Sequence, residues 1–235
     1  MISMFKDSIP GLDNLFFTDI SSPKVILITG PPGSLKTSFC FDVMTKYVDN
    51  TGNYGIYTTL EETVDSHKNN MKSFGIELLP NIEITDVTDI REIDLLVDDE
   101  ETDYVEFMED LLRHNKMENG EEFKVFTLDS LGALYSLMEN VANMRKKMFY
   151  FFKMLRDLDL ISFVVMERSM GAEANLLGNE GFLVDGVINL SIDRSRGELT
   201  RFLQIEKMRA CNHSMEKHAV EVTNNGLEVL GPIFE

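Results

Sequence analysis

The stretch that decides the fold is Gly30-Pro31-Pro32-Gly33-Ser34-Leu35-Lys36-Thr37. It follows Val25 to Thr29, an apolar and β-branched run that is typical of a strand buried on both faces. It precedes Lys36 to about Tyr47, whose apolar residues have helical spacing. A strand, a glycine turn that ends in Lys-Thr, and a helix together predict a phosphate-binding loop.

Each part of this loop has a chemical task in holding phosphate. The backbone N–H groups and the positive end of the helix dipole converge on the phosphate oxygens. Lys36 adds a positive charge near the β and γ positions, and the Thr37 hydroxyl is placed for a Mg²⁺ ion. The Pro31-Pro32 pair stiffens the entry to the loop. We therefore predict ATP with Mg²⁺ as the ligand.

Leu35 departs from the usual pattern G-x-x-x-x-G-K-[ST], in which glycine stands directly before the lysine. Glycine suits that position because the loop wraps closely around phosphate and can use dihedral angles that a Cβ atom disfavours. A leucine forced into such a conformation costs about 1–3 kcal/mol. The sequence leaves open whether the leucine weakens binding or the loop is remodelled around it.

Outward from the loop, strand patterns alternate with helix patterns along the chain. This alternation predicts an α/β fold in which a mostly parallel sheet carries helices on both faces. Beyond residue 185 the pattern changes, and an antiparallel extension with a hairpin turn at Asn225-Gly226 is expected. No linker divides the chain, so we expect a single domain over 1–235. The predicted strands are 55–60, 82–86, 123–128, 161–166, 185–192, 199–207, 217–223 and 227–230, and the further helices are 62–74 and 140–158.

Acidic side chains follow several of the predicted strands, at the edge of the sheet where the phosphate loop lies. Asp129 ends an apolar strand and is predicted to hold Mg²⁺ with Thr37. Glu61 and Glu62 end another strand, where a carboxylate would orient the water that attacks the γ-phosphate, or would only begin the next helix. Glu167 ends a third strand and is either a γ-phosphate sensor or a plain cap.

The predicted site residues form two groups. Two cations near the end of a late strand, Lys207 and Arg209, are spaced to clamp phosphoryl oxygens and join Glu61 and Glu62 as candidate catalytic residues. The nucleotide-binding candidates are Gly30, Pro31, Pro32, Gly33, Ser34, Leu35, Lys36, Thr37, Ser38 and Asp129, of which Thr37 and Asp129 are also the metal ligands.

The composition excludes several functional classes. A formal net charge of -18 argues against duplex DNA as the principal ligand, because that binding depends on Lys and Arg. Only two cysteines occur, so no disulfide framework is expected and the chain is interpreted as cytoplasmic. No apolar run is long enough for a membrane span. Residues 91–122 hold thirteen Asp and Glu against three Lys and Arg, which indicates a solvated acidic helix with loops or a surface that binds a partner.

Taken together, these segments resemble the KaiC-like and RadA-like branch of the RecA-fold ATPases, and the archaeal stand-alone KaiC-like proteins best. The likeness begins at Ile9-Pro10-Gly11-Leu12-Asp13-Asn14-Leu15, which is similar to the family's IPGLDELL opening. ITGPPGSLKTS, IYTTLEET and VFTLDSLGALYS then follow in the family's order. The last fifty residues are similar to a C-terminal pattern in which KxRG precedes a small-polar loop, a strand and a glycine hairpin.

The resemblance implies roles for individual residues. Lys36, Thr37 and Asp129 match the family's phosphate and Mg²⁺ residues, and Glu61 and Glu62 match its paired glutamates. Lys207 and Arg209 match the cations that a family member offers to nucleotide bound on the neighbouring subunit. That match implies a homo-oligomer, usually a ring of six. The chain departs from the family at Leu35, at 16–22, and at 168–184, where recombinases carry a DNA-binding loop and this chain has one cation, Arg168.

Three functions remain open at this point. The first is an ATPase that couples slow hydrolysis to assembly or to the state of a protein partner. The second is a regulatory module that senses ATP without hydrolysing it, a hypothesis motivated by Leu35 and the acidic surface. The third is a RadA-paralogue-like recombination accessory protein that binds single-stranded DNA, which the charge of -18 disfavours.

Overall fold

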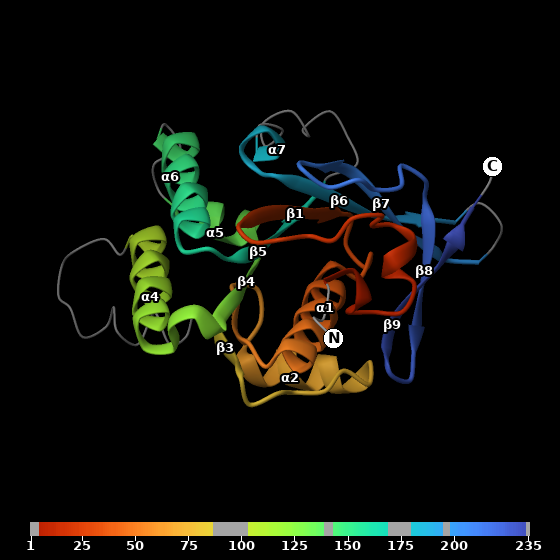
Figure 1. The fold of residues 1–235 in the computed structure, drawn as a ribbon, viewed down its shortest axis with the longest axis horizontal. Coiled ribbons are helices and arrows are strands. Elements are labelled where there is room, and N and C mark those ends of the chain that lie inside the picture. Colours follow the sequence, from red (N-terminus) through yellow and green to blue (C-terminus); the bar gives the residue numbers. More distant parts are fainter. Residues whose placement is uncertain (1–4, 87–102, 139–142, 169–179, 195–197, 234–235) are drawn as a thin grey trace.

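The computed structural model describes residues 5–86, 103–138, 143–168, 180–194 and 198–233. Its centre is a nine-stranded sheet in the order β3-β2-β4-β5-β1-β6-β7-β8-β9 (Figure 1). The strands are β1 (Lys24–Gly30), β2 (Tyr54–Thr59), β3 (Ile82–Asp86), β4 (Phe123–Asp129), β5 (Ile161–Glu167), β6 (Gly186–Asp193), β7 (Thr200–Met208), β8 (His218–Thr223) and β9 (Gly226–Pro232). The helices are α1 (Lys36–Thr51), α2 (Val64–Ser73), α4 (Tyr104–Asn119), α5 (Leu131–Ser136), α6 (Met144–Asp157) and α7 (Glu180–Leu183), with short 3-10 turns at Phe5–Asp7, Leu12–Asn14 and Gly120–Glu122.

The first six strands of the chain are parallel, and β1 lies between β5 and β6. The β1–β5 register runs from Lys24 opposite Ile161 to Gly30 opposite Glu167. Because parallel strands end at the same edge, this register brings the ends of β1, β2, β4 and β5 together. Strands β7 to β9 extend the sheet in antiparallel order. The predicted fold class and its antiparallel extension are confirmed.

Helices cover both faces of the sheet, and β1 supplies side chains to both layers. Ile26 and Ile28 pack into a core with α1 and α2, whereas Val25 and Leu27 pack into a second core with α4, α5 and α6. Figure 1 shows α1 and α2 on one side of β1 and α5 and α6 on the other. The alternation follows from the two-residue period of a strand. Both cores fix the position of β1 and therefore of the loop that follows it.

The antiparallel extension is joined to α1 by a buried carboxylate. Asp42 on α1 is completely buried, and its Oδ2 accepts a hydrogen bond of 2.6 Å from the backbone N–H of Leu227. The hairpin turn predicted at Asn225-Gly226 joins β8 to β9, and Gly226 has a φ of 98°. A side chain at Gly226 would collide with the Asp42 carboxylate, so only glycine fits there.

The described elements differ from the predicted ones in a few places. The strand predicted at 55–60 ends at Thr59, and the next N–H, of Leu60, donates to the carbonyl of Asp129. The predicted helix 140–158 is described from Met144, and Val141, expected on its inner stripe, lies outside the described residues. Helix α5 was not predicted, because six residues are too few to show a helical period in the sequence. No helix among the described residues is long and apolar enough to cross a membrane.

Candidate phosphate-binding site

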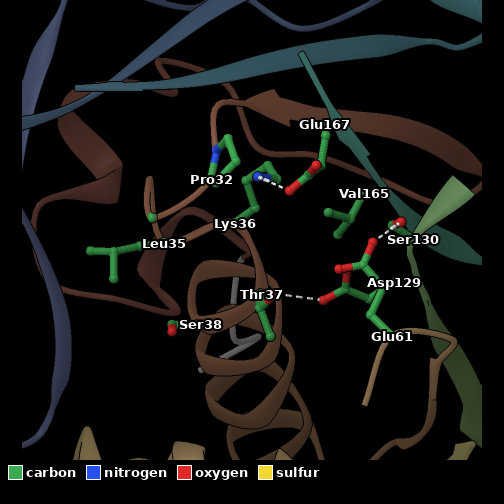
Figure 2. Close-up of a pocket in the computed structure, with 11 residues that line it drawn as sticks. Pro32, Leu35, Lys36, Thr37, Ser38, Glu61, Asp129, Ser130, Val165 and Glu167 are labelled. Atoms are coloured by element: carbon green, nitrogen blue, oxygen red, sulfur yellow. Dashed lines mark hydrogen bonds and ion pairs between the residues drawn. The ribbon is translucent and has the colours of Figure 1, made fainter. Parts of the chain in front are cut away.

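The loop between β1 and α1 borders a hollow of about 300 Å³ at the carboxyl edge of the sheet (Figure 2). Lys36 is 7% exposed, and its ammonium group donates to the carbonyl of Pro31 over 3.1 Å. Eight of the predicted site residues line this hollow, together with Ser130, Val165 and Glu167. They are Pro32, Gly33, Leu35, Lys36, Thr37, Ser38, Glu61 and Asp129.

Leu35 stands directly before α1 in the left-handed region, with φ 73° and ψ 24°. This confirms the expectation that the position uses dihedral angles unfavourable to a residue with a Cβ atom. The side chain packs against the same core as α1 and points away from Lys36 (Figure 2). The apolar contact offsets part of the backbone cost, so the loop keeps its shape without glycine.

Two neighbouring strands contact the loop, one at Gly30 and one at Gly33. A Cβ atom at Gly30 would lie 2.0 Å from the carbonyl oxygen of Leu190 on β6, so no side chain fits there. The carbonyl of Gly33 accepts a hydrogen bond of 2.9 Å from Nε of Arg201 on β7. The loop is therefore supported from the C-terminal part of the sheet as well as from β1.

Asp129 lies opposite Thr37 at the end of β4 and is 4% exposed. Its Oδ2 accepts two hydrogen bonds of 2.7 Å, one from the Thr37 hydroxyl and one from the Tyr57 hydroxyl. Burial raises the pKa of Asp129, while the hydrogen bonds from Thr37 and Tyr57 act in the opposite direction. A carboxylate and a hydroxyl are hard oxygen donors, and they sit beside a lysine and a row of loop N–H groups.

This donor set fits a divalent metal bound together with a phosphate ligand. Mg²⁺ keeps several waters and is held in proteins by one or two side-chain oxygens plus substrate phosphates. Thr37 and Asp129 would be those oxygens, and Lys36 the cation for the phosphates. Within the residues that the structure describes, no cluster of three or more His, Cys, Asp or Glu forms a separate metal site.

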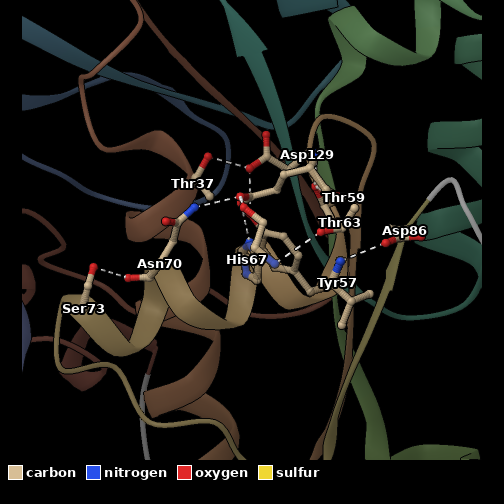
Figure 3. A network of polar contacts seen from close by, with 12 residues as sticks. Thr37, Tyr57, Thr59, Thr63, His67, Asn70, Ser73, Asp86 and Asp129 are labelled. Atoms are coloured by element: carbon tan, nitrogen blue, oxygen red, sulfur yellow. Dashed lines mark hydrogen bonds and ion pairs between the residues drawn. The ribbon is translucent and has the colours of Figure 1, made fainter.

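The two neighbouring glutamates have different surroundings. Glu61 lines the hollow, and its Oε1 accepts a short hydrogen bond from the Ser130 hydroxyl. Glu62 instead contacts side chains of α2, among them His67 and Asn70, which Figure 3 labels. It contacts Ser66 Oγ at 2.8 Å, Asn70 Nδ2 at 2.7 Å and His67 Nδ1 at 3.0 Å. The structure therefore brings Glu61, and not Glu62, to the edge that carries Thr37 and Asp129.

A buried histidine lies behind this edge. His67 is fully buried, and its ring lies 4.4 Å from that of Tyr57 and 4.9 Å from that of Phe41. Desolvation lowers the pKa of His67, although the nearby Glu62 acts to raise it. The neutral ring thus packs against the tyrosine that donates to Asp129.

Glu167 ends β5 beside the loop lysine. Its Oε1 lies 3.9 Å from the Lys36 ammonium, and the backbone N–H of the next residue, Arg168, donates to the carbonyl of Gly30. Half of the Glu167 side chain is exposed. Glu167, expected either as a γ-phosphate sensor or as a plain cap, therefore borders the hollow and contacts the Lys36 ammonium.

The predicted cations Lys207 and Arg209 lie away from their own loop. Lys207 is paired with Val187, near the start of β6, whereas the loop leaves the other end of β1. The Lys207 ammonium donates to the carbonyls of Gly181 and Val184, each at 2.7 Å. Arg209 contacts the Asp185 carboxylate at 3.5 Å. Val187 pairs with Leu27 of β1, three residues before Gly30, so at about 3.3 Å per residue Lys207 lies roughly 10 Å from the loop along the strands.

Three residues of this site escaped the sequence analysis: Tyr57, Ser130 and Arg201. In the sequence, Tyr57 is one apolar position of an ordinary buried strand, and Arg201 is one of many Lys and Arg residues. Ser130 carried a weak signal, since it follows Asp129 directly and begins a helix.

The chain matches the family described as ATPase: KaiC over residues 5–232. A UPF0273 protein of Thermotoga maritima is 31% identical, over 97% of this chain and 96% of its own length. A UPF0273 protein of Pyrococcus horikoshii is 30% identical, over 97% of this chain and 94% of its own length. The crystal structure of a KaiC-like protein from P. horikoshii superimposes with a TM-score of 0.80, covering 98% of this chain and 100% of that one, at 24% identity.

Proposed function

Because the chain belongs to the KaiC ATPase family, we propose that it binds ATP with Mg²⁺ at the Gly30–Thr37 loop and hydrolyses it slowly. The observation that carries the proposal is the position of Glu61, whose carboxylate lines the same hollow as Lys36, Thr37 and Asp129. Nucleotide binding with a divalent metal is what membership of this family implies. The identity of the nucleotide and of the metal is part of the proposal.

The residues divide the chemistry among them. The loop N–H groups and Lys36 bind the phosphates, and Lys36 exchanges its contact with Glu167 for phosphate oxygen. Thr37 and Asp129 would hold the metal, and a bound metal would supply positive charge to the phosphates. Glu61 accepts a proton from the water that attacks the γ-phosphate, the bond to the leaving ADP breaks, and inorganic phosphate forms. Glu62 supports α2 through its contacts with Ser66, His67 and Asn70.

We further propose that the active form is a homo-oligomer, with six subunits in a ring as the first expectation, and that assembly communicates with a protein partner. Lys207 and Arg209 support this, because they lie at the opposite end of the sheet from their own loop. In a head-to-tail contact they would instead approach the loop of a neighbouring copy. The whole chain would act in this contact as a single domain.

Phosphate release by the full chain tests the proposal. The wild type with ATP and Mg²⁺ should release phosphate, and Glu61→Gln should reduce the rate by roughly 100-fold or more while ATP still binds. Glu62→Gln is the matched control, since it changes the adjacent carboxylate that faces α2, and it should keep most of the rate. Mass in solution with and without ATP–Mg²⁺ measures assembly in the same samples.

A non-hydrolysing ATP sensor is the second candidate, and the left-handed Leu35 in the loop favours it. It predicts tight ATP binding and nucleotide-dependent assembly with no phosphate release. That result, from a folded and ATP-bound protein, would contradict the hydrolytic proposal. Leu35→Gly distinguishes a slow ATPase from a sensor that does not hydrolyse ATP, because a large gain in turnover would show that the native leucine slows catalysis.

A further inference from the structure

We propose that Ser130 is a positioning residue that holds Glu61 in the orientation needed to accept a proton from the attacking water. The role rests on the proposed function, because Glu61 is the base of that reaction. Ser130 touches Glu61 and borders the same hollow, and it acts through Glu61 (Figure 2).

Ser130 makes two hydrogen bonds, one through its oxygen as acceptor and one through its hydroxyl proton as donor. Ser130 is 1% exposed and begins α5 as its N-cap. Its Oγ accepts a hydrogen bond of 3.2 Å from the backbone N–H of Ala133. A hydroxyl has one proton to donate, and here that proton is directed at Oε1 of Glu61. Oε1 of Glu61 is the acceptor of this hydrogen bond.

The Ser130 hydroxyl is held by a rigid support. Leu131 and Leu134 on α5 are fully buried in the core that α5 shares with α4 and α6. A helix anchored by buried side chains places a hydroxyl more accurately than a loop does. Asp129, the preceding residue, holds the Thr37 hydroxyl, so one chain segment sets both the metal carboxylate and the support of the base.

Glu61 has little else to hold it. Its side chain is exposed, and the described residues offer it no hydrogen bond or ion pair besides the one from Ser130. Glu62, by contrast, has three partners on α2. Loss of the Ser130 hydroxyl would therefore leave the orientation of Glu61 unfixed.

The test compares kinetic constants of Ser130→Ala, Ser130→Cys and Ser130→Thr in the full chain. Alanine removes the donor, and cysteine keeps the size with a weak donor, so both should lower kcat about tenfold or more with the KM for ATP changed less than about twofold. Threonine keeps the hydroxyl and should restore kcat to within about threefold. Asp103→Ala removes the N-cap of α4, away from the hollow, and should leave kcat unchanged.

A double variant separates positioning from general stability. In a Glu61→Ala background, Ser130→Ala should cause no further loss of kcat, because the side chain that it positions is absent. A further tenfold loss would overturn the inference. So would wild-type kcat in Ser130→Ala, or an equal loss in Asp103→Ala.

Carboxyl labelling with a carbodiimide and glycine ethyl ester, read by peptide mass spectrometry, gives a readout that needs no turnover. Glu61 should be labelled several-fold faster in Ser130→Ala than in the wild type, with labelling of the Glu228 peptide unchanged. Equal labelling of Glu61 would overturn the inference. Absence of phosphate release from the wild type would refute the proposed function alone, since the labelling still decides whether Ser130 holds Glu61.

Discussion

Leu35 carries two opposing contributions to stability. Its φ of 73° costs about 1–2 kcal/mol for a residue with a Cβ atom, and its half-buried side chain recovers a similar amount through apolar contact. Leu35→Gly should therefore change the free energy of unfolding by less than about 1 kcal/mol. Leu35→Ala keeps the backbone strain and loses the contact, so it should lower that free energy by about 1–2 kcal/mol. Denaturant unfolding measures both.

This order of stability, with glycine above alanine, is the reverse of the order found within helices, so the comparison is specific to a left-handed position. The same pair of substitutions at Asn69, an exposed residue within α2, is a suitable control because glycine should be the worse residue there. A glycine variant less stable than the alanine variant at position 35 would show that the left-handed backbone costs alanine less than the conformational entropy that glycine loses on folding.

His67 predicts a pH dependence of stability. Burial lowers its pKa from 6.5 in the folded state, so below that value the unfolded chain takes up a proton that the folded chain resists. The free energy of unfolding should therefore fall as pH falls from about 7 toward 5, with a contribution of up to about 1.4 kcal/mol per pH unit. His67→Phe should lose this contribution and show a shallower slope.

The measurement is denaturant unfolding at several pH values, compared as the difference between wild type and variant so that other titrating groups cancel. His114→Gln, on the exposed side of α4, is the control for loss of a histidine as such. An identical slope in the wild type and in His67→Phe would mean that the buried ring takes up its proton as readily as it does in the unfolded chain.

At the scale of elements, Asp42 links α1 to the β8–β9 hairpin. Asp42→Ala leaves the buried N–H of Leu227 without its acceptor and should lower the free energy of unfolding by about 2–3 kcal/mol. Asp42→Asn keeps an acceptor oxygen and should lose less. Equal losses in thermal or denaturant unfolding would assign the stabilisation to the ion pair between Asp42 and Lys46 instead.

The elements most visible in the sequence were those with long local patterns. The Val25–Thr29 run and the glycine loop predicted β1 and the start of α1, and the Asn225-Gly226 turn predicted the β8–β9 hairpin. Helix α5 was missed because its role depends on one cap and on burial that only the tertiary fold supplies. The different orientations of Glu61 and Glu62 could not be predicted either, because they depend on which of the two carboxylates contacts α2 in the folded chain.

At the scale of the molecule, the separation of Lys207 from the loop predicts complementation between inactive copies. Glu61→Gln lacks the base and Lys207→Ala lacks the cation that would serve a neighbour. In an equal mixture of head-to-tail oligomers, about one contact in four joins an intact Glu61 to an intact Lys207. Phosphate release after subunit exchange should rise toward about a quarter of the wild-type rate. No gain on mixing would mean that Glu61 and Lys207 act within the same copy.

The position of Lys207 could not be predicted from its spacing to Arg209. It depends on the antiparallel register between β6 and β7, including the irregularity between Val187 and Ile188, and that register sets which end of the sheet the two cations reach. The spacing of Lys207 and Arg209 predicts only that the two cations lie near each other, whereas the direction of β7 determines which end of the sheet they reach. The family resemblance supplied the expectation of a neighbour, and the fold supplies the distance from the loop.

The support of the loop by late strands affects the order in which a growing chain matures on the ribosome. The loop is complete once residue 37 is made, yet its flanking partners are β5 at 161–167, β6 at 186–193 and Arg201. A nascent chain that ends before these residues has the motif without the walls that shape it. The loop therefore gains its full set of supports only when the last third of the chain has been made.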